Sequence, residues 1–269
     1  MNLQLLKPFA VVAISTALFA CQKTVADTQP SVSESMLAPA SAANQSQKSN
    51  TFYGPQVSMG NGKARSFVTI SHTDAPSEIG IEMTNDAFTG LPTTEEGASF
   101  VLPLHQKAQA VTPFDHIEID WNPNGHPPTP YLVPHFDFHF YKISMAEQQA
   151  IVPGPLMEIL PPSGAMPPTY IPTPGGVPQM GKHWVDVTSP ELNGKPFTKT
   201  FIYGSYNGKV IFDEPMITLA TLLSGQSSST PIPQPQIFMP ANTYYPTTYN
   251  ISADDKKHYV SLSNFVFRP

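Results

Sequence analysis

Cysteine and charge are both scarce in this sequence. Its 269 residues include one cysteine, Cys21, and 14 lysines and arginines, and charged residues make up 13%. One thiol cannot form an intramolecular disulfide bond, so the fold must be stabilised without one. The longest basic run is Lys256-Lys257. Because nucleic acids are bound through clustered basic residues, the sequence argues against nucleic acid as a main partner.

Long helices are also disfavoured, because the 31 prolines remove backbone donors and clash inside helices. A coiled coil or a helical repeat array is therefore not expected. Hydrophobic residues at 40% and aromatic residues at 10% nevertheless supply enough apolar area for a real core.

An export signal is predicted at residues 1–20. Lys7 precedes a mostly apolar run, residues 9–20, which is too short to span a bilayer. The run ends in Leu-Phe-Ala before Cys21, which resembles the lipobox of bacterial lipoproteins. An exported thiol without a disulfide partner needs another role, so we predict that Cys21 is lipidated. An ordinary signal peptide that leaves a free Cys21 is the alternative.

The predicted anchor sets the predicted location. Several acyl chains on Cys21 would bind the protein stably to a membrane, and Gln22 after the cysteine resembles lipoproteins of the outer membrane that face the periplasm. Residues 21–50 contain few large apolar side chains, so we expect a disordered tether. We assign residues 51–269 to a single β-rich domain.

The domain is expected to be mainly β, because short alternating or β-branched segments are separated by Gly, Pro, Asn and Asp. An antiparallel β-sandwich or a cupin-like barrel is predicted, with one or two short helices at 144–151 and 216–223. A proline-rich strap is expected between 153 and 178. Strands are predicted at 64–70, 79–83, 99–102, 116–121, 135–143, 183–187, 198–203, 209–212 and 259–267, with a hairpin at Asn207-Gly208.

Histidines are concentrated in one stretch. Five of the eight lie between positions 105 and 139, where an even distribution would place about one. On a strand, His135, Asp137 and His139 share one face and three phenylalanines share the other. If this strand pairs antiparallel with 116–121, the polar face gains one more His and two carboxylates. His and carboxylate side chains together favour Zn, Mn or Fe.

Strand geometry limits which of these side chains can share an ion. Residues four apart on a strand are about 13 Å apart, so His135 and His139 cannot ligate one ion on a regular strand. Asp137 joins one of them, a bulge changes the spacing, or two sites exist. His183 and Glu214 are the candidates to complete the metal ligands. His126, in a loop stiffened by prolines, is a further ligand or a general base that moves protons.

Four motifs in this region carry a resemblance to known proteins. They read DWNPxGHxP at 120–128, PHFDFHFY at 134–141, MGxHWxD at 180–186 and EPM at 214–216. Together they resemble an uncharacterised family of exported bacterial proteins, described only as a domain of unknown function. The resemblance implies a β-rich domain that can oligomerise, and it assigns no activity and no catalytic residues.

Two functional interpretations follow. In the first, the protein is an envelope lipoprotein whose β-rich domain holds a divalent metal, with an open coordination position for water or an unidentified small molecule. In the second, it is a non-catalytic ligand-binding or scaffold lipoprotein without a metal. The sequence does not decide whether the protein is an enzyme.

Overall fold

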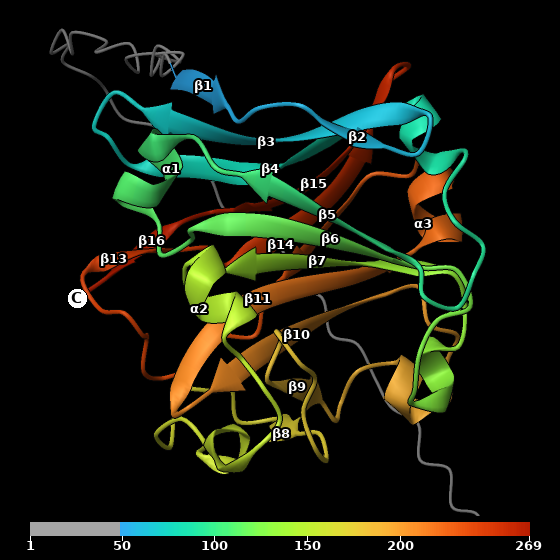
Figure 1. Ribbon diagram of the computed structural model, residues 1–269. Helices are drawn as coiled ribbons and strands as arrows, with labels where there is room; N and C mark the ends of the chain where they lie inside the picture. The colour runs from blue at the N-terminus through green and yellow to red at the C-terminus, as the bar shows by residue number, and fades with distance from the viewer. Residues whose placement is uncertain (1–48) are drawn as a thin grey trace, which may run out of the picture. The chain divides into compact units, whose positions relative to one another are not determined.

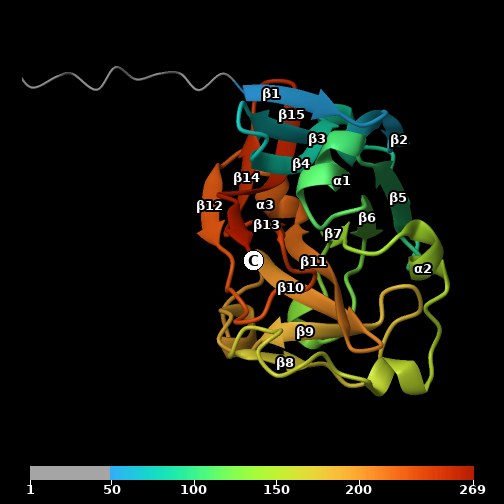
Figure 2. The same cartoon turned by 90° about the vertical axis from the view of Figure 1, so that its left-hand side faces the viewer.

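The computed structural model describes residues 49–269, and the predicted signal peptide, Cys21 and nearly all of the predicted tether lie outside this range. Two seven-stranded antiparallel sheets pack face to face as a β-sandwich, without closing into a barrel (Figure 1 and, turned by 90°, Figure 2). The fold prediction is confirmed in its sandwich form. Within the described residues, no helix has the length and hydropathy needed to cross a membrane.

The first sheet has the order β1-β3-β4-β15-β14-β12, and β2 pairs with β3. Its strands are β1 (Ser49–Tyr53), β2 (Val57–Met59), β3 (Gly62–Ser71), β4 (Pro76–Thr84), β12 (Ser228–Pro231), β14 (Thr248–Ala253) and β15 (Lys257–Ser263). β1 therefore includes the last two residues, 49 and 50, of the predicted tether.

The second sheet has the order β5-β6-β7-β11-β10-β9-β8. Its strands are β5 (Ala98–Pro103), β6 (His116–Asn122), β7 (His135–Tyr141), β8 (Tyr170–Pro172), β9 (Lys182–Asp186), β10 (Lys199–Tyr206) and β11 (Lys209–Thr218). A small third sheet pairs β13 (Thr243–Tyr245) with β16 (Val266–Arg268).

Apolar side chains that alternate with polar ones along the strands form the core between the two large sheets. Phe136, Phe138 and Phe140 of β7 are fully buried and belong to the same hydrophobic cluster as Ile79 and Ile81 of β4. Each β7 ring therefore points at the opposite sheet, and the intervening polar residues point to the outer face of the second sheet.

That outer face is covered rather than solvated. Two smaller hydrophobic clusters lie on it, one around Tyr141, Met157 and Phe212 and the other around Tyr131 and Met216. Their members come partly from the segments that connect the strands, and α2 lies in front of this sheet in Figure 1. Polar side chains on this face are consequently buried between protein layers.

The helices are short. They are α1 (Gln106–Val111), α2 (Met145–Gln149) and α3 (Leu219–Leu223), with 3-10 turns η1 (Asn85–Phe88), η2 (Thr129–Tyr131), η3 (Pro155–Glu158) and η4 (Glu191–Asn193). α1 was not predicted. The predicted helix at 216–223 was too long, because β11 continues through Thr218, and Thr218 then caps α3 by accepting a hydrogen bond from the backbone of Thr221.

The remaining strand predictions hold with adjusted ends. The β10–β11 hairpin turns at Asn207-Gly208, and both residues have positive φ, as the Asn-Gly pair predicts. The single strand expected at 259–267 is divided into β15 and β16. The strap at 153–178 contains one 3-10 turn and the three-residue strand β8, which accords with its proline content.

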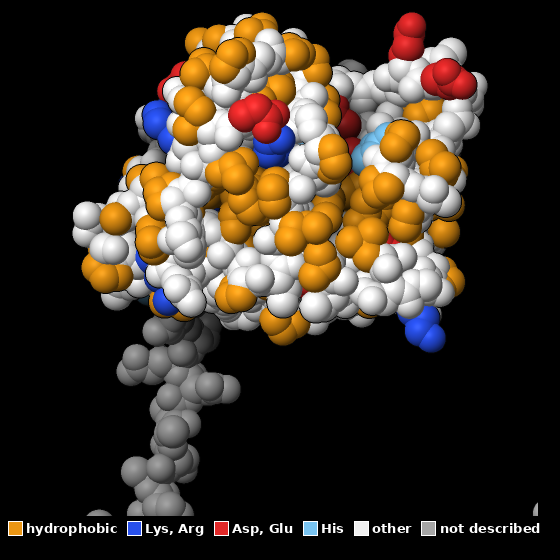
Figure 3. Space-filling model, turned by 90° about the horizontal axis from the view of Figure 1, so that it is seen from below, with side chains coloured by type: hydrophobic (Ala, Val, Ile, Leu, Met, Phe, Trp, Pro, Cys, Tyr) orange, Lys and Arg blue, Asp and Glu red, His pale blue; other side chains and the backbone are white. Residues whose placement is uncertain are grey.

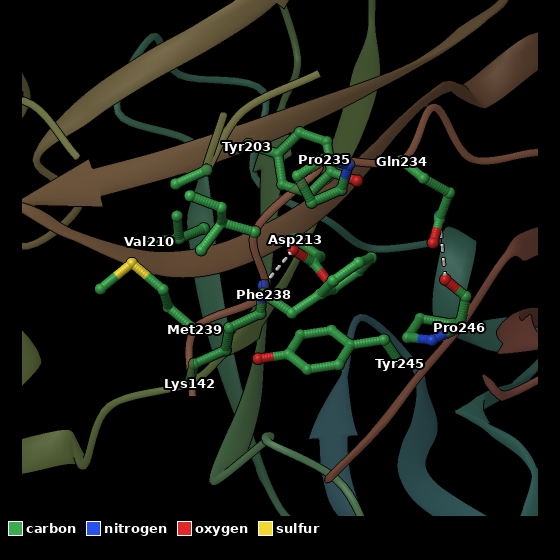
Figure 4. A pocket seen from close by; sticks show the side chains of 12 residues that line it. Lys142, Tyr203, Val210, Asp213, Gln234, Pro235, Phe238, Met239, Tyr245 and Pro246 are labelled. Carbon is green, nitrogen blue, oxygen red and sulfur yellow. Dashed lines mark hydrogen bonds and ion pairs between the residues drawn. The ribbon is translucent and has the colours of Figure 1, made fainter. Parts of the chain in front are cut away.

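A buried ion pair lies on the core side of the second sheet. The Lys142 ammonium is 2.6 Å from an Asp213 carboxylate oxygen, and both side chains are almost completely buried. The rings of Tyr203 and Tyr245 lie within 6 Å of the ammonium nitrogen, as Figure 4 shows for the surrounding pocket. The pair is enclosed by protein, with room for about 10 Å³ of solvent.

Candidate metal centre

The two histidine-rich strands pair as the sequence indicates. β6 and β7 are antiparallel, with Glu118 opposite His139 and Asp120 opposite Asp137. The polar faces of the two strands therefore coincide, and all four of these side chains are buried. β11 joins the other edge of β7 with Asp213 opposite Phe140 and Met216 opposite Asp137.

The first group of potential metal ligands combines His126, His135 and Asp137. One ligand atom from each lies within 4.8 Å of the other two. The Nε2 atom of His135 is 3.2 Å from Oδ1 of Asp137, and Nε2 of His126 is 3.3 Å from Oδ2. We call this group the outer triad, because His126 is partly exposed.

Hydrogen bonds fix how both histidines of the outer triad are oriented. Nδ1 of His135 donates to the carbonyl of Val133 at 2.7 Å, and Nδ1 of His126 donates to the carbonyl of Pro127 at 2.9 Å. A carbonyl can only accept, so each Nδ1 carries the proton and each Nε2 faces the triad. Histidine metal ligands are commonly oriented in this way.

The loop between β6 and β7 positions His126 in the outer triad. Gly125 has a φ of +69°, and a Cβ there would lie 2.0 Å from the carbonyl oxygen of Tyr131. The next residue, His126, donates its backbone N–H to that same carbonyl. Glycine is required at this point because the backbone is left-handed and in close contact with the far side of the loop.

The second group combines His139, His183 and Glu214, again with one ligand atom from each within 4.8 Å of the others. The register of β7 with β11 places Glu214 opposite His139. Oε2 of Glu214 is 3.5 Å from Nε2 of His139 and 3.8 Å from Nε2 of His183. We call this group the inner triad, since His139 and Glu214 are almost fully buried.

Asp120 supports the inner triad from behind. Its Oδ2 atom is 3.0 Å from Nδ1 of His139, and its Oδ1 accepts a hydrogen bond from the hydroxyl of Ser99. A carboxylate therefore lies beside Nδ1 of His139, the ring nitrogen that faces away from Glu214. A carboxylate at this position raises the basicity of a histidine metal ligand.

Unsatisfied polar atoms concentrate in these two triads. Between residues 49 and 269, eight buried side-chain nitrogen or oxygen atoms have no hydrogen-bond partner. Six of the eight belong to this cluster: Asp120 Oδ2, His135 Nε2, Asp137 Oδ1, both ring nitrogens of His139, and Glu214 Oε2. Buried polar atoms without partners are costly. Asp120 Oδ2 and His139 Nδ1 face each other at 3.0 Å, and an ion in each triad would accept the lone pairs of the other four atoms.

The electrostatics of the inner triad are strongly perturbed. Burial alone would lower the pKa of His139, but the carboxylates of Glu214 and Asp120 outweigh burial and raise this pKa to about 10. Burial lowers the pKa of His183 to about 3 and raises the pKa of Glu214 to about 8. Without an ion, His139 is therefore protonated and His183 is neutral at about pH 7.

The pKa values of the outer triad are also shifted. Burial opposes the charge on His126, but the hydrogen bond to Asp137 outweighs burial and raises the pKa of His126 to about 9. The pKa of Asp137 is lowered despite its burial, because the hydrogen bond to His126 and the nearby ring of His135 favour its charged form. Perturbed groups of this kind are typical of functional sites.

Both triads border one pocket. It has a volume of about 700 Å³ and is lined by His126 and Asp137 of the outer triad and by His183 of the inner triad. Trp121 and Met180 are among its apolar lining residues, and no lysine or arginine lines it. The lower face of the molecule has a hollow with a histidine side chain inside, bordered by hydrophobic side chains (Figure 3).

The structure brings all six candidate side chains together, but as two groups of three. His135 and His139 are separated, as strand spacing requires, and His126 stands among the ligands of the outer triad and not as an isolated base. The supporting residues Asp120, Asn122 and Ser99 were not predicted as part of the site. Asn122 donates to Asp137 at 2.8 Å, and its position in the 120–128 motif was the available signal.

His116 lies apart from both triads. Its Nε2 contacts Gln148 at 2.8 Å, and Gln148 in turn donates to Glu118 at 2.7 Å. The ring also stacks on Tyr141. These contacts satisfy His116 and Glu118 structurally, so neither adds a ligand to the triads.

Comparison with known proteins gives a partial family match. Residues 71–121 are similar to the uncharacterised family described as "TTHB210-like: Hypothetical protein TTHB210". The matched range runs from the end of β3 to Trp121 in β6 and includes Asp120, but it ends before the residues of both triads. No curated protein and no solved structure shows a significant match to the chain.

Proposed function

We propose that the protein binds a divalent transition metal, Zn, Mn or Fe, through His126, His135 and Asp137. The observation that carries the proposal is that Nε2 of His135 and Oδ1 of Asp137 are buried without hydrogen-bond partners inside a group of two histidines and one carboxylate. Such a group is the ligand set of many zinc hydrolases and of non-haem iron enzymes.

The neighbourhood of the outer triad supports a reactive site over a structural one. Three protein ligands leave a coordination position open, and the triad borders the pocket through His126 and Asp137. A metal ion there would act as a Lewis acid toward water or an organic ligand. Trp121 and Met180 line the pocket with apolar surface, which orients such a ligand and excludes bulk water.

We further propose that the protein works in the cell envelope, tethered to the outer membrane through a lipid on Cys21 and facing the periplasm. The support is the sequence alone: an apolar run that ends in a lipobox-like string.

Metal content tests the proposal. The protein, produced without a histidine tag and freed of loosely bound ions, should retain Zn, Mn or Fe, and His135→Ala should lose the ion held by the outer triad. His72→Ala, which removes an exposed histidine, is the matched control and should retain it. Wild-type protein that stays metal-free after incubation with each of the three ions would refute the proposal.

A second candidate function is partner binding without a metal. Val152, Leu156, Ile159 and Leu160 in and next to the strap are each more than 40% exposed. Apolar side chains gathered in this way favour contact with another protein or with a second copy of the chain. Analytical ultracentrifugation of wild type and of Leu156→Ser with Leu160→Ser tests it, because loss of self-association in the variant would support this function.

A further inference from the structure

We infer that the inner triad, His139, His183 and Glu214, is a second metal site that holds its own divalent ion and joins β7, β9 and β11. The inference extends the proposed function from one ion to two and rests on it for the identity of the metal. Three features of the molecule support a second ion: the geometry of the inner triad, the spacing of ligands along β7, and the buried carboxylates on the outer face of the second sheet.

The inner triad is complete without any residue of the outer triad. Its three ligand atoms lie within 4.8 Å of one another, and three different strands contribute them. Oε2 of Glu214 and both ring nitrogens of His139 have no hydrogen-bond partner. Asp120 lies 3.0 Å from Nδ1 of His139, which leaves Nε2 as the atom directed at Glu214 and His183.

The spacing along β7 separates this site from the outer one. Asp137 and His139 are two residues apart, or roughly 7 Å along a strand. Ions that share a bridging ligand are usually about 3.5–4 Å apart. Each triad has its own carboxylate, Asp137 or Glu214, so two separate ions need no shared ligand.

Charge balance also favours two ions. Asp120, Asp137 and Glu214 are three buried carboxylates on one face. Their ion-pair partners are histidines alone. Buried carboxylates need compensating charge. Histidines bind a metal as neutral ligands, so a single divalent ion leaves one of these three negative charges uncompensated, and a second ion compensates it.

The number of ions per chain decides the inference. Wild-type protein titrated with Zn²⁺ or Co²⁺ should bind two equivalents, and His183→Ala and His135→Ala should each bind one. The double variant should bind none, and His72→Ala should still bind two. Glu214→Gln preserves shape and repeats the His183 test if that variant is unstable, with circular dichroism and the unfolding midpoint as checks on folding.

The possible failures are distinguishable. No binding by wild type would overturn both the proposed function and this inference. One equivalent that His135→Ala removes and His183→Ala leaves unchanged would overturn the inference and keep the proposed function. One equivalent removed by either variant would mean a single shared site and would also overturn the inference.

Discussion

Nε2 of His139 and Oε2 of Glu214 face each other across β7 and β11 at 3.5 Å, and neither atom has a hydrogen-bond partner. A structural pair would be expected to align donor and acceptor, since leaving buried groups unpaired costs about 1–3 kcal/mol each. Instead, the ligand atoms of His139, Glu214 and His183 all lie within 4.8 Å of one another, where one ion could contact all three.

Asp120 offers the first test of that relationship. Asp120→Asn should lower the metal affinity of the inner triad about 10- to 100-fold, because the carboxylate beside Nδ1 of His139 increases the basicity of the ring. Competition with a chromophoric chelator measures the change. Asp115→Asn is the control, since Asp115 contacts His116 outside both triads. Unchanged affinity in Asp120→Asn would contradict a supporting role.

Gly125 offers a test of the loop that carries His126. Gly125→Ala should weaken metal binding at the outer triad, because its Cβ would lie 2.0 Å from the Tyr131 carbonyl. Gly175→Ala is matched to it, with a φ of +73° but no heavy atom within 4 Å of the new Cβ. Strain from positive φ is common to both variants, so a larger loss of affinity in Gly125→Ala isolates the contact. Equal affinities would show that the loop adapts.

The buried pair of Lys142 and Asp213 should matter for stability and not for metal binding. Lys142→Met leaves the buried carboxylate of Asp213 uncompensated and should lower the free energy of unfolding by about 3–5 kcal/mol. The double variant Lys142→Met with Asp213→Leu removes both charges and should recover much of the loss. Urea unfolding measures both values. A double variant no more stable than Lys142→Met would mean that the aromatic pocket in Figure 4 needs the ion pair.

Metal binding should release protons at about pH 7. His126 and His139 have pKa values raised to about 9 and about 10, so both are protonated at that pH in the absence of an ion. Ligation requires the deprotonated nitrogen, so apparent affinity should rise as pH increases toward these values. Calorimetry in buffers of different ionisation enthalpy counts the protons. Binding without proton release would contradict the roles of both histidines as ligands.

Anchoring through Cys21 can be tested in cells. Cys21→Ser should move the protein from the membrane fraction to the soluble fraction after lysis, because a single thiol is the only lipid acceptor available. Labelling with a fatty-acid analogue should disappear in the same variant. Membrane association that survives the substitution would contradict the lipid anchor.

Much of the sandwich follows from alternation alone. Phe136, Phe138 and Phe140 identify the core face of β7, and the pairing of two amphipathic neighbours aligns the opposite faces of β6 and β7. Short strands such as β2 and β8 carry too few residues for a periodic signal. The sequence predicts a strand that ends at Phe212, whereas β11 continues through Pro215 to Thr218, although proline is uncommon in a sheet interior.

The ligand residues were predictable, but their grouping was not. Strand spacing separated His135 from His139, which left two sites open as one of three solutions. The grouping of the ligands depends on the register of β11 with β7 and on the path of the loop around Gly125. The alternation of residues within a single strand predicts neither of these. The burial of the polar face also depends on distant segments that cover it.

β1 belongs to the first sheet and pairs with β3 over five residues, whereas every triad residue except His126 lies on a strand of the second sheet, and the His126 loop joins two of its strands. Tension applied to the chain just before Ser49 would therefore peel an edge strand from the far layer first. The metal ligands would be displaced only after the hydrogen bonds between β1 and β3 had broken. A mechanical load on the N-terminal side therefore leaves the pocket undistorted until that point.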